Sequence, residues 1–361
     1  MGLVTAHDRS AWLHVLESVE QYDFYHLPDY HILAEHRGEG KGMLFVHREE
    51  DAIAAWPFLL RDVQEVEGLE DVGQGYKDAT SVYGYPGPLY SRRAGEIEGF
   101  ISRFHESLVS TALEMRIVSM FSRMNPLLGN TVQLDHFGYL ERRGSTVYID
   151  LMQSDDLQFS QFRADHRRKI RRARQQGFNV YRDEALVHLE DFAGMYAETM
   201  TRVNAKKSYL FDISYFKELR AALGDRLQMF VVEHEGKICT FSMFVRTGAI
   251  VQNHLSASTG DIESALGSRL VIDEARLWAK KAGATMMHLG GGFGGKEDGV
   301  FEFKSGFSKC RADFYLWKMV LLPSVYGRLT LARQGYFSTG ADGRLDESFF
   351  PSYRSSPLSG L

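Results

Sequence analysis

A single lysine stands among phenylalanines shortly after a stretch that is rich in glycine. Residues 301–307 read FEFKSGF with Lys304 among them, and five of the six residues 290–295 are glycine. A preorganised cation beside a group that becomes negatively charged during a reaction stabilises the transition state by about 3 kcal/mol. The pattern predicts that Lys304 stabilises an oxyanion in surroundings kept dry by the phenylalanines. The alternative is a lysine that reaches from a sheet edge into water.

The glycine stretch directly follows a predicted short strand, ATMMHLG, and it opens with Gly290, Gly291 and Gly292. A backbone that lacks Cβ atoms lets a substrate come close, so we expect these three residues to contact substrate. A surface turn would have the same composition. The stretch is not a dinucleotide-binding fingerprint, because no strand–helix–strand unit surrounds it near the start of a domain.

A basic segment at 162–178, FRADHRRKIRRARQQGF, has the apolar spacing of a helix and ends at Gly177. Between Arg163 and Arg174 it carries seven Lys or Arg residues and one acid. Like charges this dense repel one another, which favours a polyanionic partner such as RNA over a merely solvated face. The residues expected to contact RNA phosphates are Arg167, Arg168, Lys169, Arg171, Arg172 and Arg174.

Composition and charge are those of an ordinary globular protein. The chain has 361 residues, 44% hydrophobic and 25% charged, with a formal net charge of −5, so a polyanion would have to meet a local patch. The two cysteines, Cys239 and Cys310, form neither a zinc-ligand spacing nor a disulfide framework, and we expect no metal. The beginning of the sequence lacks a signal-peptide pattern and no long apolar run occurs, which predicts a cytoplasmic protein without an integral membrane segment.

Two similar strand–turn–strand patterns, at 42–60 and 227–245, indicate a duplicated domain. After the basic helix the second half predicts two helices, three antiparallel strands, a helix at 264–283, a short strand, the glycine loop, a short helix and a last strand. This is the acetyltransferase-like α/β order. The expected domains are 1–155, 156–321 as the catalytic domain, and 322–361 as an extension that packs back on the first domain and ends in a polar tail.

Four segments in this order, HRRKIRRARQQGF, NHLSAS, the helix at 264–282 and HLGGG with FEFKSGF, resemble the Fem-type aminoacyl transferases (the FemABX group). The resemblance covers roughly 160–320. It implies two tandem acetyltransferase-like (GNAT) domains of α/β (α+β) class, with mixed sheets flanked by helices. It also implies an acyltransferase that moves an amino acid from aminoacyl-tRNA to an amine and forms an amide bond. The acceptor would be a peptidoglycan precursor or a small peptide or natural-product intermediate, and aminoacyl-tRNA would be a co-substrate, with no further cofactor.

The resemblance also implies roles for single residues. Lys304 and Phe303 match the Phe-Lys motif of the family, in which the lysine stabilises the tetrahedral intermediate. His254 lies in the third strand, where the family places a substrate-contacting aromatic residue; it would be a catalytic base or a core histidine. Arg202 and Tyr209 lie in the region that binds the acceptor.

The first half contributes one candidate segment. The loop 78–90, DATSVYGYPGPLY, combines Pro and Gly residues that favour turns with several tyrosines. Tyr83 and Tyr85 would line a substrate wall, unless the loop is a packed surface turn.

Two other functions compete with aminoacyl transfer. The first is an N-acyltransferase that uses acetyl-CoA or another acyl-CoA. Such enzymes hold pyrophosphate at a glycine-rich helix start, whereas SALGSRL offers only Gly267, with Arg269 as a phosphate partner. The second is a non-catalytic RNA-binding module. The stretch 180–230 lacks the long charged helical arm of some Fem members, so the chain resembles the compact ones. A lipid-linked acceptor would bring the protein to a membrane surface.

Overall fold

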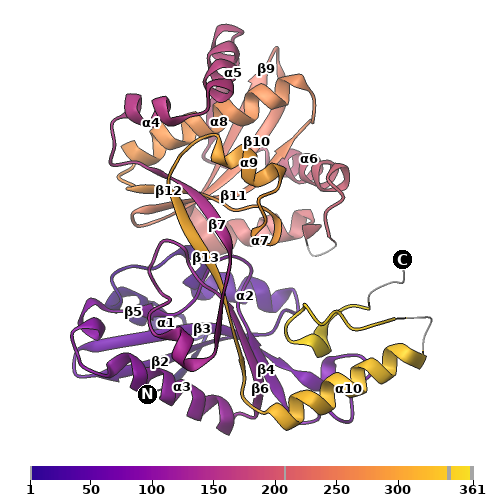
Figure 1. Ribbon diagram of the computed structural model, residues 1–361. Coiled ribbons are helices and arrows are strands. Elements are labelled where there is room, and N and C mark those ends of the chain that lie inside the picture. The colour runs from indigo at the N-terminus through magenta and orange to yellow at the C-terminus, as the bar shows by residue number, and fades with distance from the viewer. Residues whose placement is uncertain (1, 207–208, 340–342, 358–361) are drawn as a thin grey trace. The chain divides into compact units, whose positions relative to one another are not determined.

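The computed structural model describes residues 2–206, 209–339 and 343–357 (Figure 1). Contacts within the chain divide it into two compact units: unit 1 contains residues 1–142 and 314–361, and unit 2 contains residues 143–313. The chain passes between them within β7 (Tyr139–Asp150) and β13 (Arg311–Val320), so unit 2 is inserted between two segments of unit 1. The domain ranges expected from the sequence place their boundaries elsewhere and stay a prediction.

Unit 1 is built on a mixed sheet with the strand order β1-β2-β3-β4-β6-β13, in which only β4 and β6 of these described neighbours are parallel. Its main core is aromatic: Trp56 and Trp317 are almost fully buried, with ring centroids 4.7 Å apart. Its elements are β1 (Gly2–Thr5), α1 (Arg9–Ser18), α2 (Pro28–His36), β2 (Lys41–Glu49), β3 (Ala52–Asp62), β4 (Lys77–Thr80), β5 (Leu89–Tyr90), α3 (Phe100–Glu114), β6 (Ile117–Arg123) and, after β13, α10 (Pro323–Thr339).

Unit 2 has the strand order β8-β9-β10-β11-β12-β7, in which β11 and β12 are the parallel pair. Helix α8 lies on this sheet because its apolar stripe, including Leu270, Ala275 and Ala279, is buried. The elements of the unit are α4 (Asp155–Gln161), α5 (Ala164–Gln175), β8 (Asn179–Asp183), α6 (Leu189–Arg202), α7 (Ile213–Leu223), β9 (Leu227–His234), β10 (Lys237–Thr247), β11 (Ile250–Ser258), α8 (Ile262–Lys281), β12 (Met286–Gly290) and α9 (Gly299–Ser305).

The two units repeat one topology. In each, an edge strand is followed by two helices, three antiparallel strands, a helix and a strand parallel to the third of the three. The predicted hairpins at 42–60 and 227–245 are the β2–β3 and β9–β10 pairs. The expected α/β class with mixed sheets and flanking helices is confirmed. Strand β8 was not predicted, because its five residues, NVYRD, are too short for a clear alternating pattern.

Residues after β13 contribute to unit 1 through a buried polar contact. The carboxylate of Asp78 on β4 is fully buried and accepts hydrogen bonds from Arg61, at 2.6 Å, and from Arg354. The hydroxyl of Tyr353 donates to the same carboxylate at 3.2 Å. Such a pair of cations compensates the cost of burying the charge. Within the expected polar tail, residues 340–342 and 358–361 lie outside the described residues.

Candidate active site

The parallel strands β11 and β12 pair over only part of their length. The register runs from Ile250 opposite Met286 to Gln252 opposite His288, and β11 then continues to Ser258. On its other side β11 carries a bulge: the register with β10 skips His254, which is the extra residue. Beyond Gln252, the residues of β11 therefore have no residue of β12 paired with them.

Lys304 lies in the last turn of α9, close to the loop that follows β12. Its ammonium donates a 2.8 Å hydrogen bond to the carbonyl oxygen of Gly291. The residue as a whole is half-buried, but its charged end is desolvated, and burial lowers the pKa of Lys304 to about 8 while the charge of Asp298 opposes the shift. Lys304 is therefore protonated at neutral pH, but its pKa lies much closer to neutral pH than that of an exposed lysine.

His288 is the buried neighbour of this cation. Its Nδ1 lies 2.6 Å from Oε1 of Gln252, the residue opposite it in the strand register, and its ring is fully buried. Burial, and after it the charge of Lys304, lowers the pKa of His288 to about 3. The imidazole is thus neutral at physiological pH and adds no second positive charge.

Asp298 organises the glycine loop. Its side chain accepts hydrogen bonds from the amides of Phe293, at 2.8 Å, and of Val300 and Phe301, both at 3.0 Å. Burial opposes ionisation, but these amides together lower the pKa of Asp298. A Cβ on Gly292 would overlap Asp298 and the backbone of Lys296, so this glycine is required by the packing of the loop itself. Gly290 has a positive φ of 80°.

The phenylalanines near Lys304 were expected to surround its ammonium, but the ring contacts that they make are with other side chains. Phe303 and Phe307 pack on each other, with centroids 5.2 Å apart, and on His166 of α5. Phe301 is buried and carries the guanidinium of Arg311 over its ring. The partner of the ammonium is the loop carbonyl of Gly291, which no local pattern around Lys304 indicated.

A polar pocket of about 340 Å³ adjoins this segment and lies entirely within unit 2. Phe303, the residue before Lys304, forms one wall, and Arg202 forms another. The hydroxyls of Ser242 and Ser256 lie 2.7 Å apart across β10 and β11. The remaining lining residues are mostly small or polar: Asn253, Ser258, Gly260, Asp261, Ser264, Ala265, Ser268, Arg269 and Ile272.

Arginines supply the positive charge of this pocket. Arg202 donates to the carbonyl of Ser258 at 2.7 Å, and its guanidinium lies against Gly260, 2.7 Å from where a Cβ would be. Arg269 is half-buried, and none of the described carboxylates forms an ion pair with it. Arg202 and Arg269 therefore both line the pocket, and Asp261 is the acidic residue among the described residues that line it.

The start of α8 is already occupied by a carboxylate. Oδ1 of Asp261 accepts from the amide of Ser264 at 2.7 Å, and the Ser264 hydroxyl accepts from the amide of Gly260 at 3.0 Å. Helix starts bind anions through free amides. The negative Asp261 cap, with Glu263 in the first turn, opposes a pyrophosphate at this end.

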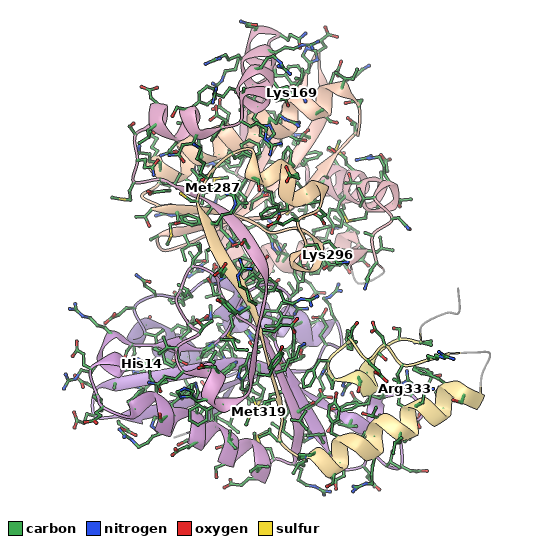
Figure 2. The ribbon with its side chains drawn as sticks, in the orientation of Figure 1. His14, Lys169, Met287, Lys296, Met319 and Arg333 are labelled. Carbon is green, nitrogen blue, oxygen red and sulfur yellow. The ribbon has the colours of Figure 1, made fainter. Side chains whose placement is uncertain are left out.

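Acids from other parts of the chain pair with two of the seven cations at 163–174, and Asp165 of α5 itself pairs with two more. Arg174 bridges Asp273, which is fully buried, and Glu274 of α8, and Lys169, labelled in Figure 2, pairs with Asp165. The predicted repulsion is thus smaller than the composition of the helix indicates. The ion pairs are Arg163–Glu302, Arg168–Asp165, Lys169–Asp165, Arg174–Asp273 and Arg174–Glu274.

The other cations of α5 have no carboxylate partner among the described residues. Arg167 donates to the backbone carbonyl of Phe162. Arg171 lies over the ring of Phe159 at 5.6 Å, and it is exposed, as is Arg172. Arg171 and Arg172 are therefore the positions on this helix best placed to meet a polyanion.

The remaining predicted residues make contacts of their own within the unit to which each belongs. Burial lowers the pKa of His254 to about 4, so it carries no charge at neutral pH. Tyr209 packs edge-on against Phe293 of the glycine loop, with centroids 6.1 Å apart. Tyr83 and Tyr85 belong to unit 1, where the Tyr83 carbonyl accepts from Tyr30. Tyr85 packs against Tyr25 and Phe314 of the same unit.

Sequence reasoning missed several residues that the structure brings to the site. Asn253, Ser256 and Asp261 line the pocket, and Asp298 holds the loop. His166 was counted only as part of the basic segment. Within the described residues no cluster of His, Cys, Asp and Glu could hold a metal ion, and no helix is long and apolar enough to cross a membrane.

Comparison with known proteins gives the class first. Residues 160–305 match the family model of the acetyltransferase (GNAT) domain, which supports an acyltransferase. The fold is that of FemX: the two chains superpose with a TM-score of 0.65 at 14% identity, over 91% of this chain and 99% of FemX. The Fem-type resemblance is thereby confirmed at the level of the fold. L-PGS from Bacillus licheniformis is also similar, with a TM-score of 0.55 at 14% identity, over 86% of this chain and 91% of that one. No curated protein sequence matched.

Proposed function

We propose that the protein is an aminoacyltransferase that moves an amino acid from aminoacyl-tRNA to an amine acceptor. The observation that carries the proposal is the desolvated ammonium of Lys304, which is fixed to the Gly291 carbonyl one residue from the pocket wall. The amine would attack the ester carbon, the bond to the ribose oxygen would break, and an amide would form. A cytoplasmic location is part of the proposal, and the acceptor would be a peptidoglycan precursor or a small peptide.

Lys304 would stabilise the oxyanion of the tetrahedral intermediate. A cation that is already desolvated and oriented needs no reorganisation when the negative charge develops. His288 and His254 are neutral, and neither is required as a base if the amine arrives unprotonated and the ribose oxygen takes its proton. Gly290 to Gly292 would place the loop backbone beside the substrate.

The nature of the donor is supported by the polar pocket and by α5. The hydroxyl groups, the amide of Asn253 and the guanidinium of Arg269 could bind the ribose and phosphates of a tRNA end. The Asp261 cap disfavours CoA pyrophosphate at the start of α8. Arg171 and Arg172 would contact the RNA backbone beyond the pocket, and Arg202 and Tyr209 would contact the acceptor.

The test is a donor assay with a matched pair of lysine variants. Purified protein is offered tRNA charged with labelled amino acids, and separately labelled acetyl-CoA, with a panel of amine acceptors. Label should pass from tRNA, and Lys304→Met should lower kcat by about 10²–10³-fold. Lys296→Met is the control, because Lys296 is an exposed cation in the same loop (Figure 2).

Other outcomes identify the competing functions. Transfer from acetyl-CoA alone would establish the acyl-CoA-dependent N-acyltransferase. RNA binding that survives Lys304→Met, with no transfer from either donor by the wild type, would indicate a non-catalytic RNA-binding module. A Lys304→Met variant with the wild-type rate would remove Lys304 from the mechanism.

A further inference from the structure

The first turn of α5 is attached to the last turn of α9, which carries Lys304. The amide of Arg163 donates to the carbonyl of Gly306 at 2.7 Å, and its guanidinium pairs with Glu302 at 3.0 Å. The last carbonyls of a helix have no partners within that helix. The basic helix supplies such partners here, so a displacement of α5 would be felt at the turn that holds the cation.

His166 is the buried centre of this attachment. Its Nε2 lies 3.0 Å from the carbonyl oxygen of Phe303, and its Nδ1 lies 3.3 Å from Nε of Arg269. A guanidinium can only donate and a carbonyl can only accept, so Nδ1 must carry the lone pair and Nε2 the proton. A Cβ on Gly306 would overlap the imidazole, which shows how closely the ring is enclosed.

The electrostatic surroundings keep this tautomer neutral. Burial is the main cause that lowers the pKa of His166 to about 4, and the charges of Arg269 and Arg163 act in the same direction. The carboxylate of Asp165 opposes them and is shared with Arg168 and Lys169. The imidazole therefore makes both hydrogen bonds across the physiological pH range.

Arg269 connects the same ring to the pocket. Its Nη1 donates to the carbonyl of Ala265 at 2.6 Å, and its guanidinium lies 5.1 Å from the ring centroid of Phe303. The side chain is thus aimed at the pocket by His166 on one side and by its own helix on the other. One imidazole fixes a cation of the pocket and the residue that precedes Lys304.

We propose that His166 is a positioning residue, which sets Arg269 through Nδ1 and the Phe303–Lys304 segment through Nε2, and so couples occupation of the donor pocket to the placement of Lys304. The expected changes in KM and kcat rest on the proposed function, whereas the hydrogen bonds of the imidazole and their effect on Lys304 do not. The two ring nitrogens have separate tasks, which makes them separable by substitution.

Two amide side chains separate the tasks. The nitrogen of a glutamine can reach the place of Nε2, so His166→Gln should keep the bond to Phe303 and remove the bond to Arg269. The oxygen of an asparagine can take the place of Nδ1, so His166→Asn should do the reverse. With charged tRNA, His166→Gln should raise the donor KM at nearly constant kcat. His166→Asn should lower kcat on the order of 10²-fold at nearly constant donor KM.

A magnetic-resonance experiment needs no turnover. In protein labelled with ¹⁵N-histidine, His166 should show a protonated Nε2 and an unprotonated Nδ1. In protein labelled at lysine Cε, the pKa of Lys304, about 8 in the wild type, should be unchanged in His166→Gln and should move toward 10.5 in His166→Asn. Thermal unfolding of both variants checks that they are folded.

The opposite results would overturn the inference. A protonated Nδ1 would contradict the geometry, and an unchanged Lys304 pKa in both variants would show that the ring does not hold the lysine. Parallel changes of KM, kcat and melting temperature in both variants would reduce His166 to a space-filling residue. If the wild type transfers no amino acid from tRNA, the proposed function fails, and the resonance data still decide the role of His166.

Discussion

The ammonium of Lys304 lies 2.8 Å from the carbonyl oxygen of Gly291, so the cation of α9 is fixed to the loop that precedes its own helix. Asp298, between these residues in the chain, caps α9 and holds the amide of Phe293. The loop, the helix start and the lysine therefore form one local unit. Its parts can be tested separately.

The rate should fall with rising pH as Lys304 loses its proton. Because burial lowers the pKa of Lys304 to about 8, the charged form is present below that pH and is lost above it. We expect a descending limb of kcat/KM near pH 8. Lys304→Arg, whose charge persists beyond this range, should shift that limb upward. A profile without this descending limb, or one that is the same in the wild type and in Lys304→Arg, would contradict a role for the charge of Lys304.

Lys304 should also make stability depend on pH. Its pKa is about 8 in the folded state and near 10.5 when exposed, so between these values the unfolded chain binds more protons. The contribution of this lysine to the free energy of unfolding should therefore increase as the pH rises across that window. Denaturant titrations of the wild type and Lys304→Met should differ in slope against pH, and Lys296→Met should follow the wild type. Identical slopes for all three proteins would contradict the desolvated ammonium.

Gly292 should be far less tolerant of a side chain than Gly299. A Cβ on Gly292 would overlap a backbone carbonyl, which has no flexible end to move, whereas a Cβ on Gly299 meets nothing within 4 Å. We expect Gly292→Ala to displace the loop and lower kcat at least tenfold, by analogy with other small misplacements at active sites, which cost up to about 10²-fold. Gly299→Ala should have nearly wild-type kinetics. Equal activity of the two variants would show that the loop does not position Lys304.

The salt dependence of tRNA binding should distinguish the cations of α5. Arg171 and Arg172 are exposed without a carboxylate partner among the described residues, whereas Arg174 holds Asp273 and Glu274. Removing one cation that touches a phosphate should reduce the slope of log K against log salt by about 1. Arg171→Gln and Arg172→Gln should do so, and Arg174→Gln should instead lower the melting temperature. Fluorescence anisotropy over a salt series measures the slopes, and unchanged slopes in Arg171→Gln and Arg172→Gln would exclude these two arginines from phosphate contact.

The sequence was informative where a pattern is local. The hairpins at 42–60 and 227–245 are visible because buried strands and their charged turns are neighbours in the chain. The position of Lys304 after a glycine loop is equally local. The secondary structure around Lys304 was also predictable, since residues 299–305 form the short helix expected after the glycine loop.

Contacts between distant segments could not be predicted from such patterns. The charge count of α5 suggested strong repulsion because Asp273, Glu274 and Glu302 lie about 100 residues or more away in the chain. For the same reason His166 appeared to be one more member of a basic run. Its partners, Phe303 and Arg269, become neighbours only when the sheet of unit 2 brings α5, α8 and α9 together.

The insertion of unit 2 between two segments of unit 1 has a consequence for synthesis. As the ribosome extends the chain, every strand of unit 2 emerges before β13, the strand beside β6 in unit 1. The side chains of Tyr353 and Arg354, which compensate buried Asp78, emerge later still. Unit 2, which carries Lys304, can thus fold before unit 1 has received the strand that pairs with β6 and the arginine that compensates Asp78. Unit 1 therefore cannot complete its fold until Tyr353 and Arg354 have been synthesised and can bind Asp78.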